Sequence, residues 1–156
     1  MTEQSQVSQH FDIQKIYLKD VSLETPNSPA IFTEQWQPQT EVRLDTGAAP
    51  VTQDIFEVVL TVTITSKLGE RTAYLAEVQQ AGLFTLRGFE DGQMGHMLHA
   101  FCPNILFPFA REELSSLVTK GGFPGVLLNP INFDGLYMQR LQQQQAATAG
   151  GAAAPH

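Results

Sequence analysis

Three residues have the types and spacing of metal ligands: His96, His99 and Cys102. Zinc binds histidine nitrogen and cysteine sulfur, with four ligands in a structural site. On a helix the two histidines would lie on adjoining turns, whereas Cys102 is rotated away from them and precedes Pro103, a helix breaker. Because no fourth ligand is evident, we predict that the protein binds no metal ion.

The same cysteine is a poor candidate for a nucleophile. It lies in the apolar segment Phe101-Cys102-Pro103, and apolar surroundings raise the pKa of a thiol and leave it unreactive. The sequence contains no G-x-S-x-G, H-E-x-x-H, G-x-G-x-x-G or P-loop motif. We therefore predict that the protein is not an enzyme and needs no cofactor. An enzyme that uses the His96/His99/Cys102 cluster is the competing interpretation.

Four residues on two predicted strands form a second candidate site. Asp20 and Glu24 point to one side of the first strand, and Leu75 and Glu77 point to one side of the second, because strand side chains alternate between faces. If the two strands are neighbours, the four residues make one flat acidic patch that contains a leucine. Acidic surface residues also serve solubility alone, so the pattern leaves open whether the patch binds a partner.

The formal net charge of the 156 residues is −7. Nucleic acids and anionic membranes would repel such a chain, so we predict that it binds neither and that a basic partner is favoured. With 42% hydrophobic and 16% charged residues, the composition is that of a globular protein. The length predicts one domain over residues 10–145, between a flexible N-terminus at 1–9 and a disordered tail at 146–156.

The sequence also indicates the compartment. Cys102 is the single cysteine, so no disulfide framework is possible and a reducing environment is expected. The first residues, MTEQSQVSQ, lack the basic and apolar regions of a signal peptide. No apolar run approaches the roughly 18 residues that a membrane span needs. We therefore predict a cytoplasmic protein that does not insert into a membrane.

The elements that must position these residues begin with a central hairpin over residues 54–86, whose two arms are joined by a polar loop at 66–70. The return arm, residues 72–80, has apolar residues on both faces. A sheet of this kind must be covered on both sides, by helices of its own chain and by another subunit or ligand. In the first arm one apolar face opposes a threonine-rich one, and it consists of Phe56, Val58, Leu60, Val62 and Ile64.

Further strands and helices flank this hairpin. Alternation predicts a strand over residues 10–24 that places Phe11 and Tyr17 on the same face, and an extended segment over residues 31–45 that contains Trp36. Helices are expected over 93–101, where Pro103 should disrupt the helix, and over 109–118. A final helix is expected to carry one apolar stripe, formed by Phe133, Leu136, Tyr137 and Leu141.

The chain has more apolar surface than one small core requires. Core packing accounts for any one of these residues, but together they indicate grooves that hold extended apolar segments of many sequences. The candidates are Trp36, the turn Phe107-Pro108-Phe109, the loop Val126-Leu127-Leu128, and the residues Phe133, Tyr137 and Leu141.

Four ordered stretches make the chain resemble the SecB family of bacterial protein-export chaperones over residues 11 to about 145. They are IYLKD at 16–20, EVQQ at 77–80, CPNILFP at 102–108 and PINFD at 130–134. The resemblance implies an α+β subunit, with a four-stranded antiparallel sheet and helices packed on one face, assembled as a dimer of dimers. It also implies an ATP-independent chaperone that holds newly made precursors unfolded and delivers them to the SecA motor ATPase. A SecB-like chaperone with general or antitoxin-associated clients is the alternative.

The resemblance also implies roles for particular residues. Those expected to line the client groove are Trp36 and Tyr137, followed by Leu44, Phe109 and Leu141. Those expected to form the SecA-docking surface are Asp20, Glu24, Leu75 and Glu77. Those expected near the contact between subunits, on the second apolar face of the sheet, are Ala76, Val78 and Gln80.

Overall fold

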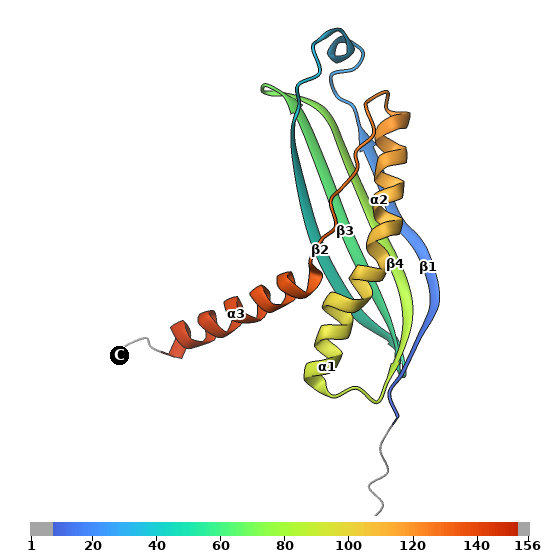
Figure 1. Ribbon diagram of the computed structural model, residues 1–156, viewed down its shortest axis with the longest axis vertical. Helices are drawn as coiled ribbons and strands as arrows, with labels where there is room; N and C mark the ends of the chain where they lie inside the picture. The colour runs from blue at the N-terminus through green and yellow to red at the C-terminus, as the bar shows by residue number, and fades with distance from the viewer. Residues whose placement is uncertain (1–7, 153–156) are drawn as a thin grey trace, which may run out of the picture.

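The computed structural model describes residues 8–152 and contains one antiparallel sheet of four strands in the order β1-β4-β3-β2 (Figure 1). The predicted central hairpin is β3 and β4, which turn at Gly69, where a φ of 62° suits glycine. The α+β class and the four-stranded antiparallel sheet are thus confirmed. The strands are β1 (His10–Glu24), β2 (Gln39–Thr52), β3 (Ile55–Leu68) and β4 (Arg71–Arg87).

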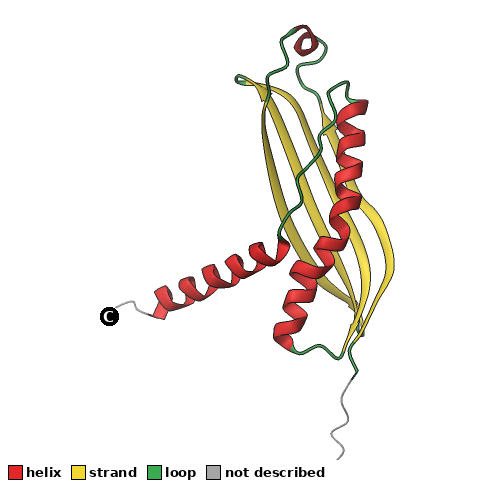
Figure 2. Ribbon diagram, viewed as in Figure 1, coloured by secondary structure: helices red, strands yellow, loops and turns green. Residues whose placement is uncertain are grey.

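A long helical rod lies across one face of this sheet (Figure 2). A short 3-10 turn, η1 (Ala30–Thr33), lies between β1 and β2, and after β4 the chain forms a continuous helical rod. The rod consists of α1 (Asp91–His96), the π-helical stretch η2 (Met97–Phe101) and α2 (Cys102–Lys120).

The sequence predicted that Pro103 disrupts the helix and left open whether the two helices form one rod; the rod in fact continues through Pro103. Pro103 stands in the first turn of α2, where a missing N–H costs little. The wider π-helical turn of η2 lies immediately before it. Pro108 is also inside α2 without ending it.

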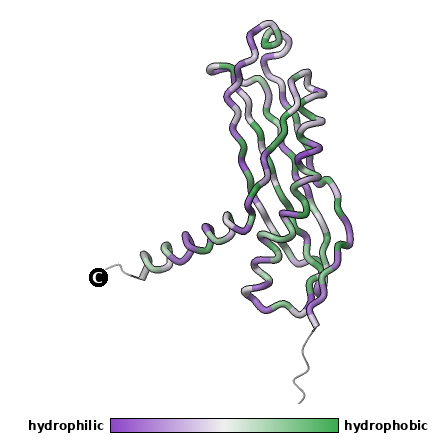
Figure 3. The backbone as a smooth tube through the Cα atoms, in the orientation of Figure 1, coloured by the Kyte–Doolittle hydropathy of each residue, from purple (hydrophilic) through white to green (hydrophobic). Residues whose placement is uncertain are grey.

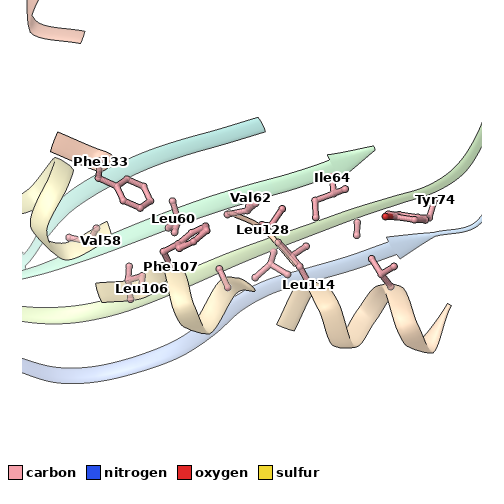
Figure 4. Packing of buried hydrophobic residues seen from close by; sticks show 14 of the residues in the cluster. Val58, Leu60, Val62, Ile64, Tyr74, Leu106, Phe107, Leu114, Leu128 and Phe133 are labelled. Atoms are coloured by element: carbon pink, nitrogen blue, oxygen red, sulfur yellow. The ribbon is translucent and has the colours of Figure 1, made fainter. Parts of the chain in front are cut away.

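The core fills the space between α2 and the sheet. Val58, Leu60, Val62 and Ile64 are fully buried there, as the alternation along β3 predicts. Figure 4 shows these side chains between the strands and the buried residues of the rod. Figure 3 shows the matching alternation of hydrophobic and hydrophilic residues along the strands. The main contributors from α2 are Leu106, Phe107, Leu114 and Val118.

The register of β3 and β4 corrects the face that we expected at the contact between subunits. Val78 pairs with Val62 and Ala76 pairs with Ile64, so both point toward α2. Both are 0% exposed in the single chain. Gln80 lies on the same buried side, and its Nε2 donates to the carbonyl oxygen of Tyr17 at 3.1 Å. These three residues therefore belong to the core of the subunit and not to its outer face.

Two irregularities in β1 change its alternation. The pairing with β4 shifts between Ile13 and Lys15 and again between Leu18 and Asp20, as in β-bulges. Each extra residue moves the following side chains to the opposite face. Tyr17 consequently points to the outer face, whereas Phe11 stacks on the buried Phe84, so the prediction that they share a face is wrong.

Helix α3 (Phe133–Ala152) extends away from the sheet and packs mainly on η2 (Figure 1). It continues past Gln145, so residues 146–152 are helical where we predicted a disordered tail. The rest of that predicted tail, 153–156, and residues 1–7 of the predicted flexible N-terminus lie outside the described residues. Within residues 8–152 no helix is both long enough and apolar enough to span a membrane.

Candidate functional site

The four residues of the acidic patch come together on the outer face of the sheet, the face opposite α2. Strands β1 and β4 are neighbours, and their register pairs Glu24 with Leu75 and Ser22 with Glu77. Asp20 pairs with the residue two positions further along β4, so its side chain points to the same face. The sequence pattern required neighbouring strands, and the sheet order supplies them.

The charges of this patch are left unneutralised. Within residues 8–152, none of the carboxylates of Asp20, Glu24 and Glu77 is in an ion pair. The hydroxyl of Thr63, on the adjacent strand β3, donates to Glu77 Oε1 at 2.8 Å and orients that carboxylate. The patch is therefore a partly ordered negative surface around an apolar side chain, Leu75.

A second acidic group on the same face differs because it is paired. Glu57 accepts a hydrogen bond from the Tyr17 hydroxyl and forms an ion pair with Lys19 Nζ at 2.7 Å. The hydrogen bonds from Lys19 and Tyr17 hold the pKa of Glu57 below its ordinary value. Burial first, and then the contact with Glu57, raises the pKa of Tyr17 to about 12. Glu57 therefore adds little free negative charge to this face.

On the other side of the molecule, Trp36 belongs to an aromatic cluster at the end of the sheet. Its ring stacks on Tyr74, with centroids 6.5 Å apart, and lies 5.5 Å from the ring of Phe123. Phe32 adds a fourth ring, 5.1 Å from Phe123. Tyr74 and Phe123 are buried, whereas Trp36 is half-buried and leaves part of its ring accessible.

A hollow of about 240 Å³ lies between β2 and α3. Leu44 lines it from β2 and Tyr137 from α3, so two of the predicted groove residues meet here. His99 and Phe133 line it as well, and the ring of His99 stacks on Tyr137 with centroids 6.2 Å apart. Phe133 was one of the apolar groove candidates, whereas His99 had been considered only as a metal ligand or as part of an enzyme site.

An extended segment joins the aromatic cluster to the hollow. Residues 124–132 have no helix or strand structure and run from Phe123 in the cluster to Phe133 in the hollow (Figure 1). A chain of this length spans at most about 36 Å. One extended peptide of roughly ten residues is therefore long enough to reach both sites.

Comparisons with known proteins identify the family. The model of the family described as "Preprotein translocase subunit SecB" matches residues 4–144. The chain belongs to the SecB family. A protein-export protein SecB from Methylococcus capsulatus is 57% identical over 94% of this chain and 96% of its own length.

A solved structure shares the fold. It is a SecB-like chaperone from Mycobacterium tuberculosis in complex with a peptide from an antitoxin, and it superposes with a TM-score of 0.63 at 15% sequence identity. The match covers 78% of this chain and 90% of that one. The SecB family consists of protein-export chaperones, and its fold agrees with the sheet and helices described above.

Phe109 and Leu141, also predicted to line the client groove, do not line the hollow. Phe109 is 46% exposed on α2 and Leu141 is half-buried on α3.

The side chains of His96, His99 and Cys102, the residues of the competing enzyme interpretation, do not point to one common site. His96 Nε2 contacts Asp134 Oδ1 at 2.5 Å, whereas His99 faces Tyr137 and Cys102 is fully buried in the core. Burial, and then the charge of Arg140, lowers the pKa of His99. Among the residues that the structure describes, no three His, Cys, Asp or Glu side chains are grouped to hold a metal ion.

Cys102 gives a simple test of this packing. Burial raises the pKa of its thiol to about 12, so the reactive thiolate is scarce at pH 8. We expect the native protein to react with a thiol reagent at least about 100-fold more slowly than the protein unfolded in guanidinium. Absorbance of the released chromophore measures both rates, and equal rates would contradict the buried position.

Proposed function

We propose that this SecB-family protein is a cytoplasmic, ATP-independent chaperone that holds newly made precursor proteins unfolded and delivers them to SecA. The observation that carries this proposal is the position of the two candidate sites on opposite sides of one sheet. The apolar sites lie on the side of the helices, and the acidic patch lies on the outer face. A client on one side therefore leaves the other side free for the motor protein.

The client site combines the aromatic cluster around Trp36 with the hollow formed by Leu44 and Tyr137. Burying one large apolar side chain contributes about 1.5–3 kcal/mol, so two separated sites engaged by one extended chain give useful affinity without a sequence requirement. Folded proteins hide such side chains and are not held. Phe109 and Leu141 act as peripheral contacts for longer clients.

The docking surface for SecA is the acidic patch of Asp20, Glu24, Leu75 and Glu77. Unpaired carboxylates attract a basic surface and steer its approach, and the leucine among them supplies apolar contact. Because Glu57 is already paired with Lys19, the attraction acts at one end of the sheet. The identity of 57% with a protein-export protein favours this partner over the antitoxin-associated alternative.

Four copies of the subunit assemble as a dimer of dimers in this proposal. Support comes from β1, an edge strand whose side chains facing the helices are poorly covered. Ile13, Leu18 and Val21 are 42%, 45% and 36% exposed there. An edge strand with exposed apolar residues is a surface that a second copy can cover. Ala76, Val78 and Gln80, which we expected near the contact between subunits, are buried beneath α2 in the single chain.

Replacing the aromatic residues of the two sites tests the proposal. Trp36→Ala and Tyr137→Ala each remove a large apolar contact, so we expect each to weaken binding of a denatured precursor by about 30-fold. Titration calorimetry measures the affinity, and light scattering checks that assembly is unchanged. Phe109→Ala serves as the matched control, with an expected loss of less than about threefold. Unchanged affinity in both test variants would contradict the assignment of the client site.

A further inference from the structure

Helix α3 is held to the rest of the subunit by its first turns. Asp134 contacts His96 at 2.5 Å, and Tyr137 lies between the rings of His96 and His99, at 6.1 and 6.2 Å. Further along, Arg140 reaches Asp45 of β2 at 3.7 Å. The remainder of the helix extends away from the sheet (Figure 1). The orientation of α3 is therefore decided at the contact of its first turns with α1 and η2.

Gly95 provides the space for this contact. The Cβ atom of any other residue at position 95 would overlap the hydroxyl oxygen of Tyr137, because the two atoms would be closer than non-bonded atoms can approach. The next nearest atom of Tyr137, the ring carbon Cζ, would be 3.5 Å away, which is ordinary van der Waals contact. The conflict thus involves the hydroxyl alone.

Gly92, the other glycine of α1, shows that the close approach of a neighbouring side chain is confined to position 95. Gly92 has no atom within 4 Å of the place where its side chain would begin, so alanine fits there without displacement. Glycine inside a helix lowers helix stability relative to alanine. At position 95 glycine is required because Tyr137 approaches so closely. At position 92 no neighbouring atom requires glycine.

We propose that Gly95 is a positioning residue that seats the hydroxyl end of Tyr137 and, with the His96–Asp134 contact, holds α3 in the orientation that closes the hollow beside Leu44. The link between this seat and client affinity rests on the proposed function, in which Tyr137 lines the client site. Only a docked α3 presents Tyr137 to a client. Weaker docking therefore lowers the apparent affinity by the fraction of molecules that remain docked.

The test compares four variants of the full chain: Gly95→Ala, Gly92→Ala, Tyr137→Phe and the double variant Gly95→Ala/Tyr137→Phe. Two quantities are measured, amide hydrogen exchange in the first turns of α3 and calorimetric affinity for a denatured precursor. In Gly95→Ala we expect exchange in α3 to accelerate and affinity to fall, each by about tenfold. Gly92→Ala should match the unmodified protein in both.

Rescue separates positioning from a general loss of structure. Because Tyr137→Phe removes the atom that conflicts with alanine, the double variant should equal Tyr137→Phe alone in both measurements. Unchanged exchange in Gly95→Ala would overturn the proposal. So would a loss that the double variant fails to restore, since the hydroxyl would then not be its cause. If exchange responds as expected but client affinity does not, the seat is correct and the assignment of Tyr137 to the client site is wrong.

Discussion

Glu77→Lys is expected to abolish docking on SecA while leaving client binding intact. The change replaces a carboxylate at the centre of the patch with a positive charge. Residue 77 of β4 pairs with Ser22, which lies between Asp20 and Glu24 on β1. A basic partner surface then meets repulsion where it met attraction, and the bond from Thr63 is also lost. We expect the affinity for purified SecA to fall by about 100-fold or more, as measured by surface plasmon resonance.

The control for this experiment is Asp12→Lys. Asp12 pairs with Thr85, so it lies on the same face and strand pair as the patch but about 27 Å away along β4. It makes the same change in net charge, so a similar loss of SecA binding would mean that overall charge, and not the patch, is recognised. Affinity for a denatured precursor should be unchanged in both variants, because the apolar sites are on the other side of the sheet.

Val78→Asp is expected to prevent folding of the subunit. Val78 is 0% exposed and packs with Val62 beneath α2, where a carboxylate finds neither water nor a partner. An uncompensated charge in such a position costs about 3–5 kcal/mol, a large part of the stability of a small domain. Circular dichroism with urea titration measures the loss.

Gln79→Asp is the matched control, one position further along the same strand. Its side chain points to the outer face, beside Thr61 and Asp20, so the aspartate remains in contact with water. We expect the unfolding free energy to fall by less than about 1 kcal/mol, through repulsion from Asp20 on the neighbouring strand. If Val78→Asp instead folded normally but failed to assemble, Val78 would belong to the contact between subunits, and its place in the core would be contradicted.

Strand β3 shows where sequence alone was sufficient. Val58, Leu60, Val62 and Ile64 recur at every second position opposite a threonine-rich face interrupted by Val59, and such an apolar face is expected to point toward the core. The residues of the acidic patch could also be predicted from the sequence, because alternation fixes which residues of a strand share a face. That prediction needed one further fact, the adjacency of β1 and β4.

Strands β4 and β1 show where the sequence alone was insufficient. Both faces of β4 carry apolar residues, so only the pairing of Val78 with Val62 decides that Ala76, Val78 and Gln80 are internal. In β1 the bulge between Ile13 and Lys15 moves Tyr17 to the outer face, and a bulge depends on how the strand fits its neighbour. Local sequence patterns contain no information on which face of β4 is buried or where a bulge occurs in β1.

The amino-acid sequence by itself determined the class of fold, the central hairpin, the family resemblance and which residues of each strand could belong to the acidic patch, because each depends on residue types within one segment or on one periodicity. The tertiary structure decided which face of β4 is the core, how the apolar candidates divide between Trp36 and the hollow at Tyr137, and why Gly95 lies opposite a tyrosine 42 residues later. Those features depend on contacts between segments far apart in the chain, which packing alone brings together.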